Sequence, residues 1–248
     1  MAGQTKGSYF LKQQRTARKI RQTLRDLANP AIAEHSLRFF KTGKGEYGEG
    51  DKFLGIGVPV LRKQIKTFKH TPLKEIQSVL ESSFHEERLF ALLLLVEKFA
   101  KGDEKERTAI YKLYLTNTAH INNWDLVDSS ADRIVGAHLV SKDKKPIYRL
   151  ARSENLWERR IAIMSTFHLI KIGVFDDALE ISSILRDDEE DLIHRAVGWM
   201  LREIGNRDLT IEKIFLKKHY KKMPRTMLRY AIEKFSETDR KMYLRGAI

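Results

Sequence analysis

Several residue types and motifs are missing from this sequence. It contains no cysteine, which excludes disulfides, thiolate zinc sites, iron–sulfur clusters and a cysteine nucleophile. The longest apolar run lies around Phe90–Val96 and is far shorter than the roughly 20 residues of a membrane-spanning helix. The first residues lack the apolar stretch of a signal peptide. We therefore expect an intracellular protein with no membrane partner.

Motifs for metals, nucleotides and serine nucleophiles are scarce as well. The 8 histidines include no His-Glu-x-x-His and no other close pair at ligand spacing, so we expect no metal. No Gly-x-Ser-x-Gly motif is present. The segment Gly43–Gly48 matches the Gly-x-Gly-x-x-Gly pattern of dinucleotide sites, which requires a preceding strand. Because a helical stretch, Leu37–Phe40, precedes it and more glycines follow, we predict a flexible loop there.

Positive charge is in excess. The chain carries 46 Lys and Arg against 33 Asp and Glu, a formal net charge of +13. Such an excess favours a polyanionic partner, most often nucleic acid, and the alternatives are an anionic membrane surface or simple solubility. Basic residues outnumber acidic ones most clearly in Lys6–Ala33 and from Glu212 onward. In a curved array of helices, these basic ends would form a continuous groove for a duplex; a solvated charged face is the alternative.

The apolar spacing is helical almost throughout, and each of the 5 prolines precedes a helix-period segment. Capping boxes and glycine stops delimit three long helices. They are Ser83 with Glu86 and Gly102, Asn155 with Glu158 and Gly173, and Asp187 with Glu190 and Gly205. A further helix is expected from about Trp124 to Val140.

The spacing of these helix pairs is about 30 to 40 residues, which overlaps the period of helical repeats. We therefore predict an all-α fold, a superhelical array of HEAT-like repeats (an α-solenoid) with a concave basic groove. A non-repeating helical domain is the alternative. Residues 1–8 are expected to be a disordered N-terminal tail, and residues 9–248 a single HEAT-like repeat domain.

Charged residues interrupt two apolar helix faces. At about 100° per residue, Asp128 shares a face with Trp124, Ala131 and Val135. Arg160 similarly falls on the side of its helix that carries apolar residues. Burying an unpaired charge costs on the order of several kcal/mol, so both charges require a partner or a function. A functional site is one interpretation, and a buried ion pair between Asp128 and Arg160 is the other.

Trp199 lies at the border of a third apolar face, next to Arg195 and Arg202 on the polar flank. A tryptophan beside arginines can stack on a nucleoside or pack against a sugar. Simple packing is the alternative for Trp124 and Trp199, and we assign Trp157 to the core.

Four segments carry a family likeness. They are Phe53–Pro59, Trp124–Ser129, Asn155–Arg160 and Arg195–Glu203. In this order they resemble the AlkD-like DNA alkylation repair family. The resemblance implies a superhelix of HEAT-like repeats whose concave face holds duplex DNA, and release of N3- or N7-alkylated purines as free bases. Trp124, Asp128, Arg160 and Trp199 fall on the functional motif positions of that family.

The chemistry of such a reaction fits these side chains. An alkylated purine already carries positive charge and leaves readily, so one carboxylate, Asp128, can stabilise the sugar cation or activate water. Trp124 and Trp199 would attract the charged nucleoside, and Arg160, with Arg195 and Arg202, would bind DNA. We expect a monofunctional glycosylase without lyase activity, cofactor or metal.

The expected partner is double-stranded DNA carrying alkylated bases, and the expected state is a monomer. The expected location is the cytoplasm, with nucleoid association in a prokaryote. Two other functions remain open from the sequence. The first is a non-catalytic HEAT-repeat protein that binds distorted or branched DNA. The second is a HEAT-type module that binds an acidic protein.

Overall fold

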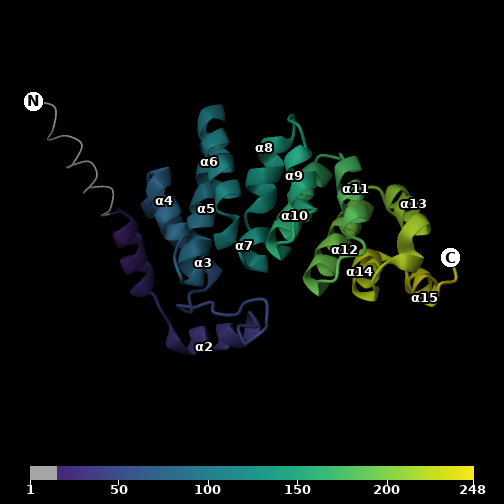
Figure 1. Cartoon of the computed structure of the whole chain (residues 1–248), viewed down its shortest axis with the longest axis horizontal. Coiled ribbons are helices and arrows are strands. Elements are labelled where there is room, and N and C mark those ends of the chain that lie inside the picture. Colours follow the sequence, from purple (N-terminus) through teal and green to yellow (C-terminus); the bar gives the residue numbers. More distant parts are fainter. Residues whose placement is uncertain (1–15) are drawn as a thin grey trace, which may run out of the picture. The chain divides into compact units, whose positions relative to one another are not determined.

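The computed structural model describes residues 16–248, so the tail expected at residues 1–8 lies outside the described part. Within residues 16–248 the regular structure is helical, and the single extended pairing is an isolated bridge between Lys52 and Phe84. Within each of two compact units, helices that are close in the sequence pack against one another, as the helices of an α-solenoid do (Figure 1). The predicted fold class is confirmed, while the concave basic groove stays a prediction.

The chain divides into two compact units, Met1–Ser130 and Ala131–Ile248. The single domain expected over residues 9–248 stays a prediction. The helices of the first unit are residues 16–25, α2 (Pro30–Phe39), α3 (Val58–Phe68), α4 (Leu73–Leu80), α5 (His85–Lys101), α6 (Glu104–Thr116), η1 (Thr118–His120) and α7 (Trp124–Asp128). Those of the second are η2 (Asp132–Gly136), α8 (Ala137–Leu139), α9 (Lys145–Leu150), α10 (Leu156–Lys171), α11 (Asp176–Ile184), α12 (Asp191–Gly205), α13 (Leu209–His219), η3 (Tyr220–Lys222), α14 (Arg225–Ala231), η4 (Ile232–Lys234) and α15 (Glu237–Arg245).

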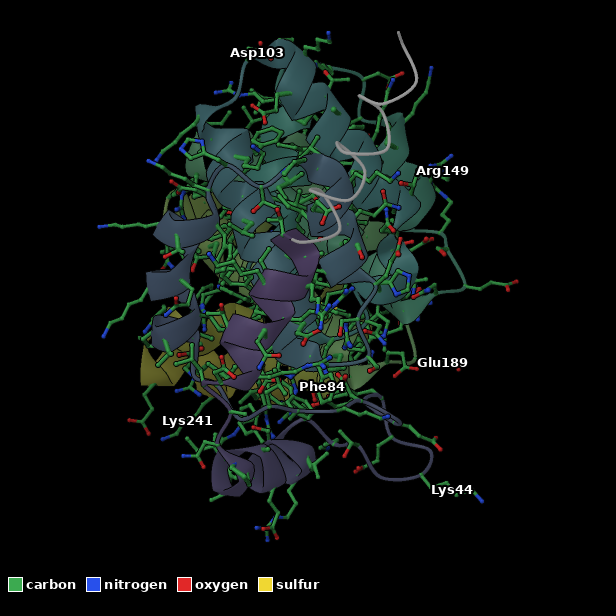
Figure 2. All side chains as sticks on the ribbon, turned by 90° about the vertical axis from the view of Figure 1, so that its left-hand side faces the viewer. Lys44, Phe84, Asp103, Arg149, Glu189 and Lys241 are labelled. Carbon is green, nitrogen blue, oxygen red and sulfur yellow. The ribbon has the colours of Figure 1, made fainter. Side chains whose placement is uncertain are left out.

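Helix α5 is the centre of the first unit. It packs against α3, α4, α6 and α7, and its apolar run from Leu89 to Leu95 is buried on every side. A helix that is apolar all round needs such neighbours on all its faces. By contrast, α2 contains no buried residue. The loop that follows α2 includes Gly43–Gly48, as predicted, and the side chain of Lys44 points outwards from it (Figure 2).

Helices α10 and α12 form the centre of the second unit. Helix α10 packs against η2, α9, α11 and α12, and α12 also packs against α13 and α14. The closest approach requires Gly198 on α12, because a Cβ there would lie 2.4 Å from the carbonyl oxygen of Met227 and 2.5 Å from the Cβ of Tyr230 on α14. Gly136 likewise allows η2 to approach α10 closely, because a Cβ at this position would lie 2.2 Å from the carbonyl oxygen of Ser165.

The predicted helix starts are partly right. All five prolines lie at the N-cap or in the first turn of a helix. Asn155 caps α10, since its side chain accepts the N–H of Trp157 at 2.8 Å. The predicted capping box of Ser83 and Glu86 is wrong, because Phe84 is the N-cap residue and Glu86 accepts N–H groups from another segment. The box expected at Asp187 is also wrong, since α12 begins only at Asp191.

The helix expected from Trp124 to Val140 is interrupted. Helix α7 ends at Asp128, a turn follows at Ser129 and Ser130, and the chain continues as the π-helical segment η2. The hydroxyl of Ser130 donates to the carbonyl oxygen of Leu126, so a side chain competes for the backbone acceptors at this point. The face that Asp128 was expected to share with Ala131 and Val135 therefore does not continue as one α-helix.

Candidate functional site

Helix α7 holds the first two predicted site residues. Leu126 and Val127 are buried and anchor the helix in the first unit. Trp124 and Asp128, four residues apart, are half-buried. The buried Asn123 caps the helix, because its side-chain oxygen accepts the N–H of Trp124 at 2.8 Å. Trp124 and Asp128 thus lie one turn apart on the same side of α7, and their joint action as a site stays a prediction.

The indole of Trp124 belongs to an aromatic cluster. It stacks on Phe40, with ring centroids 5.5 Å apart, and meets Phe39 edge-on at 5.9 Å. Phe40 in turn stacks on Phe53 at 5.0 Å. The exposed fraction of Phe39 is 56%, so the cluster reaches the surface of the first unit at the end of α2. These rings fix the plane of the Trp124 indole.

A buried ion cluster lies beside the aromatic rings. The ring of His85 bonds through Nδ1 to Asp51 at 2.9 Å and through Nε2 to Asp125 at 2.8 Å. Arg88 donates to the second oxygen of Asp51 at 2.8 Å. Burial alone would lower the pKa of His85, but the hydrogen bonds to Asp125 and Asp51 outweigh it and raise that pKa to about 9. His85 is therefore an imidazolium at neutral pH.

The same contacts set the charge of the partner carboxyl. Burial alone would raise the pKa of Asp51, but the hydrogen bond from His85 and the charge of Arg88 hold that pKa below its usual range. The cluster thus consists of two cations and two carboxylates within the first unit. Asp125 directly follows Trp124 in the chain, so the cluster contacts the first turn of α7.

In the second unit Arg160 lies on α10 and has an exposed fraction of only 5%. Its guanidinium donates to the carbonyl oxygen of Leu192 in the first turn of α12 at 2.6 Å. The neighbouring Arg159 pairs with Asp188 at 2.6 Å. The predicted position of Arg160 on the buried side of its helix is confirmed, and the contact with Leu192 ties α10 to α12.

Trp199 is half-buried on α12. Its ring lies 6.0 Å from that of Phe167 on α10, and its Nε1–H donates to Glu203 at 3.3 Å. Lys171 stands 4.8 Å above the Phe167 ring, and Arg207 stands 5.9 Å from it. The cations at this aromatic pair are thus Lys171 and Arg207, whereas the sequence analysis placed Arg195 and Arg202 beside Trp199.

Both arginines predicted beside Trp199 pair with acids. Arg195 is exposed and bonds to Asp191 at 2.7 Å, one turn earlier on α12. Arg202 forms an ion pair with Glu233 of η4. A phosphate would have to compete with these carboxylates for the guanidinium groups.

The predicted residues thus form two local sets, Trp124 with Asp128 on α7 and the other four on α10 and α12. Sequence reasoning missed Phe39, Phe40 and the His85 cluster. The adjacent pair Phe39–Phe40 is visible in the sequence, but no spacing rule connects it with Trp124. Nothing in the sequence links Asp51 with His85, because they come together only when the loop before α3 folds against α5.

Metal-binding groups and membrane-spanning helices are absent from residues 16–248. Among residues 16–248, no group of three histidine, aspartate or glutamate side chains is arranged to hold a metal ion. In the same part of the chain, the helices are all too short or too polar to cross a bilayer.

Comparison with known proteins gives one family. A family model described as DNA alkylation repair enzyme matches residues 20–235. Among solved structures, a predicted DNA alkylation repair enzyme from Enterococcus faecalis has the same fold, with a TM-score of 0.66 at 19% sequence identity. That match covers 85% of this chain and 97% of the other. No curated protein matches the sequence.

Proposed function

This chain belongs to the DNA alkylation repair enzyme family, and from that premise we propose that it is a DNA glycosylase for positively charged alkylpurines. The proposed reaction is hydrolysis of the N-glycosidic bond of N3- or N7-alkylated purines in duplex DNA. The observation that supports it most is the half-buried pair of Trp124 and Asp128 on α7, whose opposite side is anchored by buried residues. An indole and a carboxylate so held suit a cationic substrate.

Alkylation at N3 or N7 makes the base a good leaving group. When the bond between C1′ and the purine nitrogen breaks, its electron pair moves to the purine and cancels the positive charge. The sugar is left as an oxocarbenium ion, which the carboxylate of Asp128 stabilises. Water then adds to C1′, and its proton passes to Asp128 and on to solvent. The products are a free base and an abasic site.

The other site residues bind the substrate. The indole faces of Trp124 and Trp199 each attract a cationic nucleoside by about 0.5 to 2 kcal/mol. Arg160, whose guanidinium also donates to the carbonyl oxygen of Leu192, holds a backbone phosphate. Arg195 and Arg202 exchange their carboxylate partners for phosphates when DNA binds. The net charge of +13 supports this electrostatic attraction.

We further propose that the enzyme acts as a monomer without metal or cofactor, in the cytoplasm or at the nucleoid. It leaves the strand intact, because in this mechanism water, and not an amine, attacks the sugar. The alternative function is DNA binding without catalysis. In that alternative, the same basic charge holds distorted or branched DNA through phosphates alone.

The test is release of free base from a duplex that carries N7-methylguanine. The protein, in excess over DNA, should release 7-methylguanine faster than the spontaneous rate, as measured by chromatography. A duplex with O6-methylguanine, which is uncharged, should give no free base, and a denaturing gel should show an uncut strand. Binding without release from either duplex would reject the glycosylase and favour the non-catalytic alternative.

A further inference from the structure

His85 connects three segments of the first unit. It opens α5, bonds through one ring nitrogen to Asp51 in the loop before α3, and through the other to Asp125 on α7. A neutral imidazole carries one N–H and therefore donates only one hydrogen bond. With a carboxylate oxygen at each nitrogen, both bonds are made only when the ring carries both protons. The geometry alone thus favours the imidazolium.

The bridge is shielded from water. Exposed fractions of the side chains are 2% for His85, 4% for Asp51 and 16% for Asp125. The His85 ring also packs against two phenylalanines, stacked on Phe53 with centroids 4.7 Å apart and tilted against Phe40 at 4.8 Å. Charge-assisted hydrogen bonds in such surroundings are strong, because little water competes for them.

Two routes lead from this bridge to Trp124. The first is covalent, because Asp125 is the next residue of α7. The second passes through the rings, since Phe40 contacts both the His85 imidazole and the Trp124 indole. Helix α7 has only five residues, too few to be stable by its own backbone hydrogen bonds. Its position therefore depends on contacts such as the one between Asp125 and His85.

We propose that His85 is a positioning residue of the glycosylase site, where its two hydrogen bonds fix α7 and hence the Trp124 indole and the Asp128 carboxylate. This inference rests on the function proposed above. His85 touches neither base nor sugar in this account. Its role is to keep the indole and the carboxylate at one fixed separation, on which the rate of bond cleavage depends steeply.

The proposal includes a pH dependence. The charged groups that face His85 are Asp51 from the loop and Asp125 from α7, and Arg88 of α5 stands behind Asp51. As the pH rises past about 9, the ring loses a proton and one carboxylate loses its hydrogen bond. The hydrogen bonds that join α7 through His85 to the loop before α3 are then no longer complete, and α7 is less firmly held. The rate of base release should fall over this range while the affinity for DNA changes little.

The experiment compares three variants in single-turnover base release and DNA binding. His85→Gln can donate to one carboxylate but cannot bridge two, so it should slow release at least about tenfold with little change in DNA affinity. Asp125→Asn keeps the shape of the bridge but removes one charge. It should move the alkaline fall in rate from about pH 9 to lower pH. The control is His70→Gln, at an exposed position after α3, which should match the wild type.

A second readout does not need activity. In NMR spectra, both ring nitrogens of His85 should be protonated at pH 7.5, and His85→Gln should move the indole N–H signal of Trp124 but not that of Trp199. If the wild type releases no base while these signals behave as stated, the glycosylase is wrong and the positioning of α7 stands. An unmoved Trp124 signal, or release by His85→Gln within twofold of the wild type, would overturn the positioning role.

Discussion

Glu212 on α13 gives a prediction whose size follows from its surroundings. Its side chain is buried, with an exposed fraction of 1%, and its Oε1 has no hydrogen-bond partner within the described residues. Burial raises the pKa of Glu212 from 4.5 to about 8, although the charges of Arg202 and Lys213 oppose the shift. The folded protein therefore keeps a proton on Glu212 at neutral pH that the unfolded chain releases.

The sign and size of the effect follow from linkage. Between pH 4.5 and about 8 the folded state binds more protons than the unfolded state at this position, so the free energy of unfolding falls as the pH rises. At roughly 1.36 kcal/mol per pH unit, the loss from about pH 5 to pH 7 amounts to about 2 to 3 kcal/mol. Glu212→Gln resembles the protonated acid and lacks this loss.

Thermal unfolding followed by circular dichroism tests this reasoning. At pH 5 Glu212→Gln and the wild type should melt within a few degrees of each other, and at pH 7 the variant should melt about 5 to 10 °C higher. Glu189→Gln removes the same charge from an exposed position before α12 and should show no such change with pH (Figure 2). An equal difference between Glu212→Gln and the wild type at both pH values would refute the argument.

Three other substitutions test the packing and the proposed DNA contacts. Gly198→Ala should lower the free energy of unfolding by about 1 to 3 kcal/mol in urea titrations, because its Cβ would lie 2.4 Å from the Met227 carbonyl oxygen. Asn155→Ala removes the cap of α10 and should cost about 1 kcal/mol in the same titrations. Trp199→Leu should weaken binding to a duplex with N7-methylguanine by about 2- to 30-fold, with a smaller effect on unmodified duplex. Unchanged values would contradict each argument in turn.

Local chemistry in the sequence predicted most of the helices. Proline has no N–H to lose in the first turn of a helix, so all five prolines mark helix starts correctly. The buried charge of Arg160 and the half-buried state of Trp199 also follow from helical periodicity. These features depend on residues within two turns of each other, which a sequence displays directly.

Contacts between distant segments were not predictable in the same way. Ser83 and Glu86 have the spacing of a capping box. The carboxylate of Glu86 instead accepts three backbone N–H groups from the loop before α3, those of Leu54, Gly55 and Ile56. The end of α7 depends on a serine hydroxyl that competes for a backbone carbonyl. The bridge from Asp51 through His85 to Asp125 joins residues 34 and 40 positions apart. No periodicity encodes such a bridge.

The central claim is that the carboxylate of Asp128 promotes cleavage of the glycosidic bond. The most direct measurement is the single-turnover rate at which Asp128→Asn releases 7-methylguanine. The DNA affinity and the circular dichroism spectrum of the same variant are measured in parallel. The variant should fold, bind the duplex almost as tightly as the wild type and release 7-methylguanine only at the spontaneous rate. Release at the wild-type rate would contradict the central claim, and loss of the helical spectrum would instead assign Asp128 to a structural ion pair.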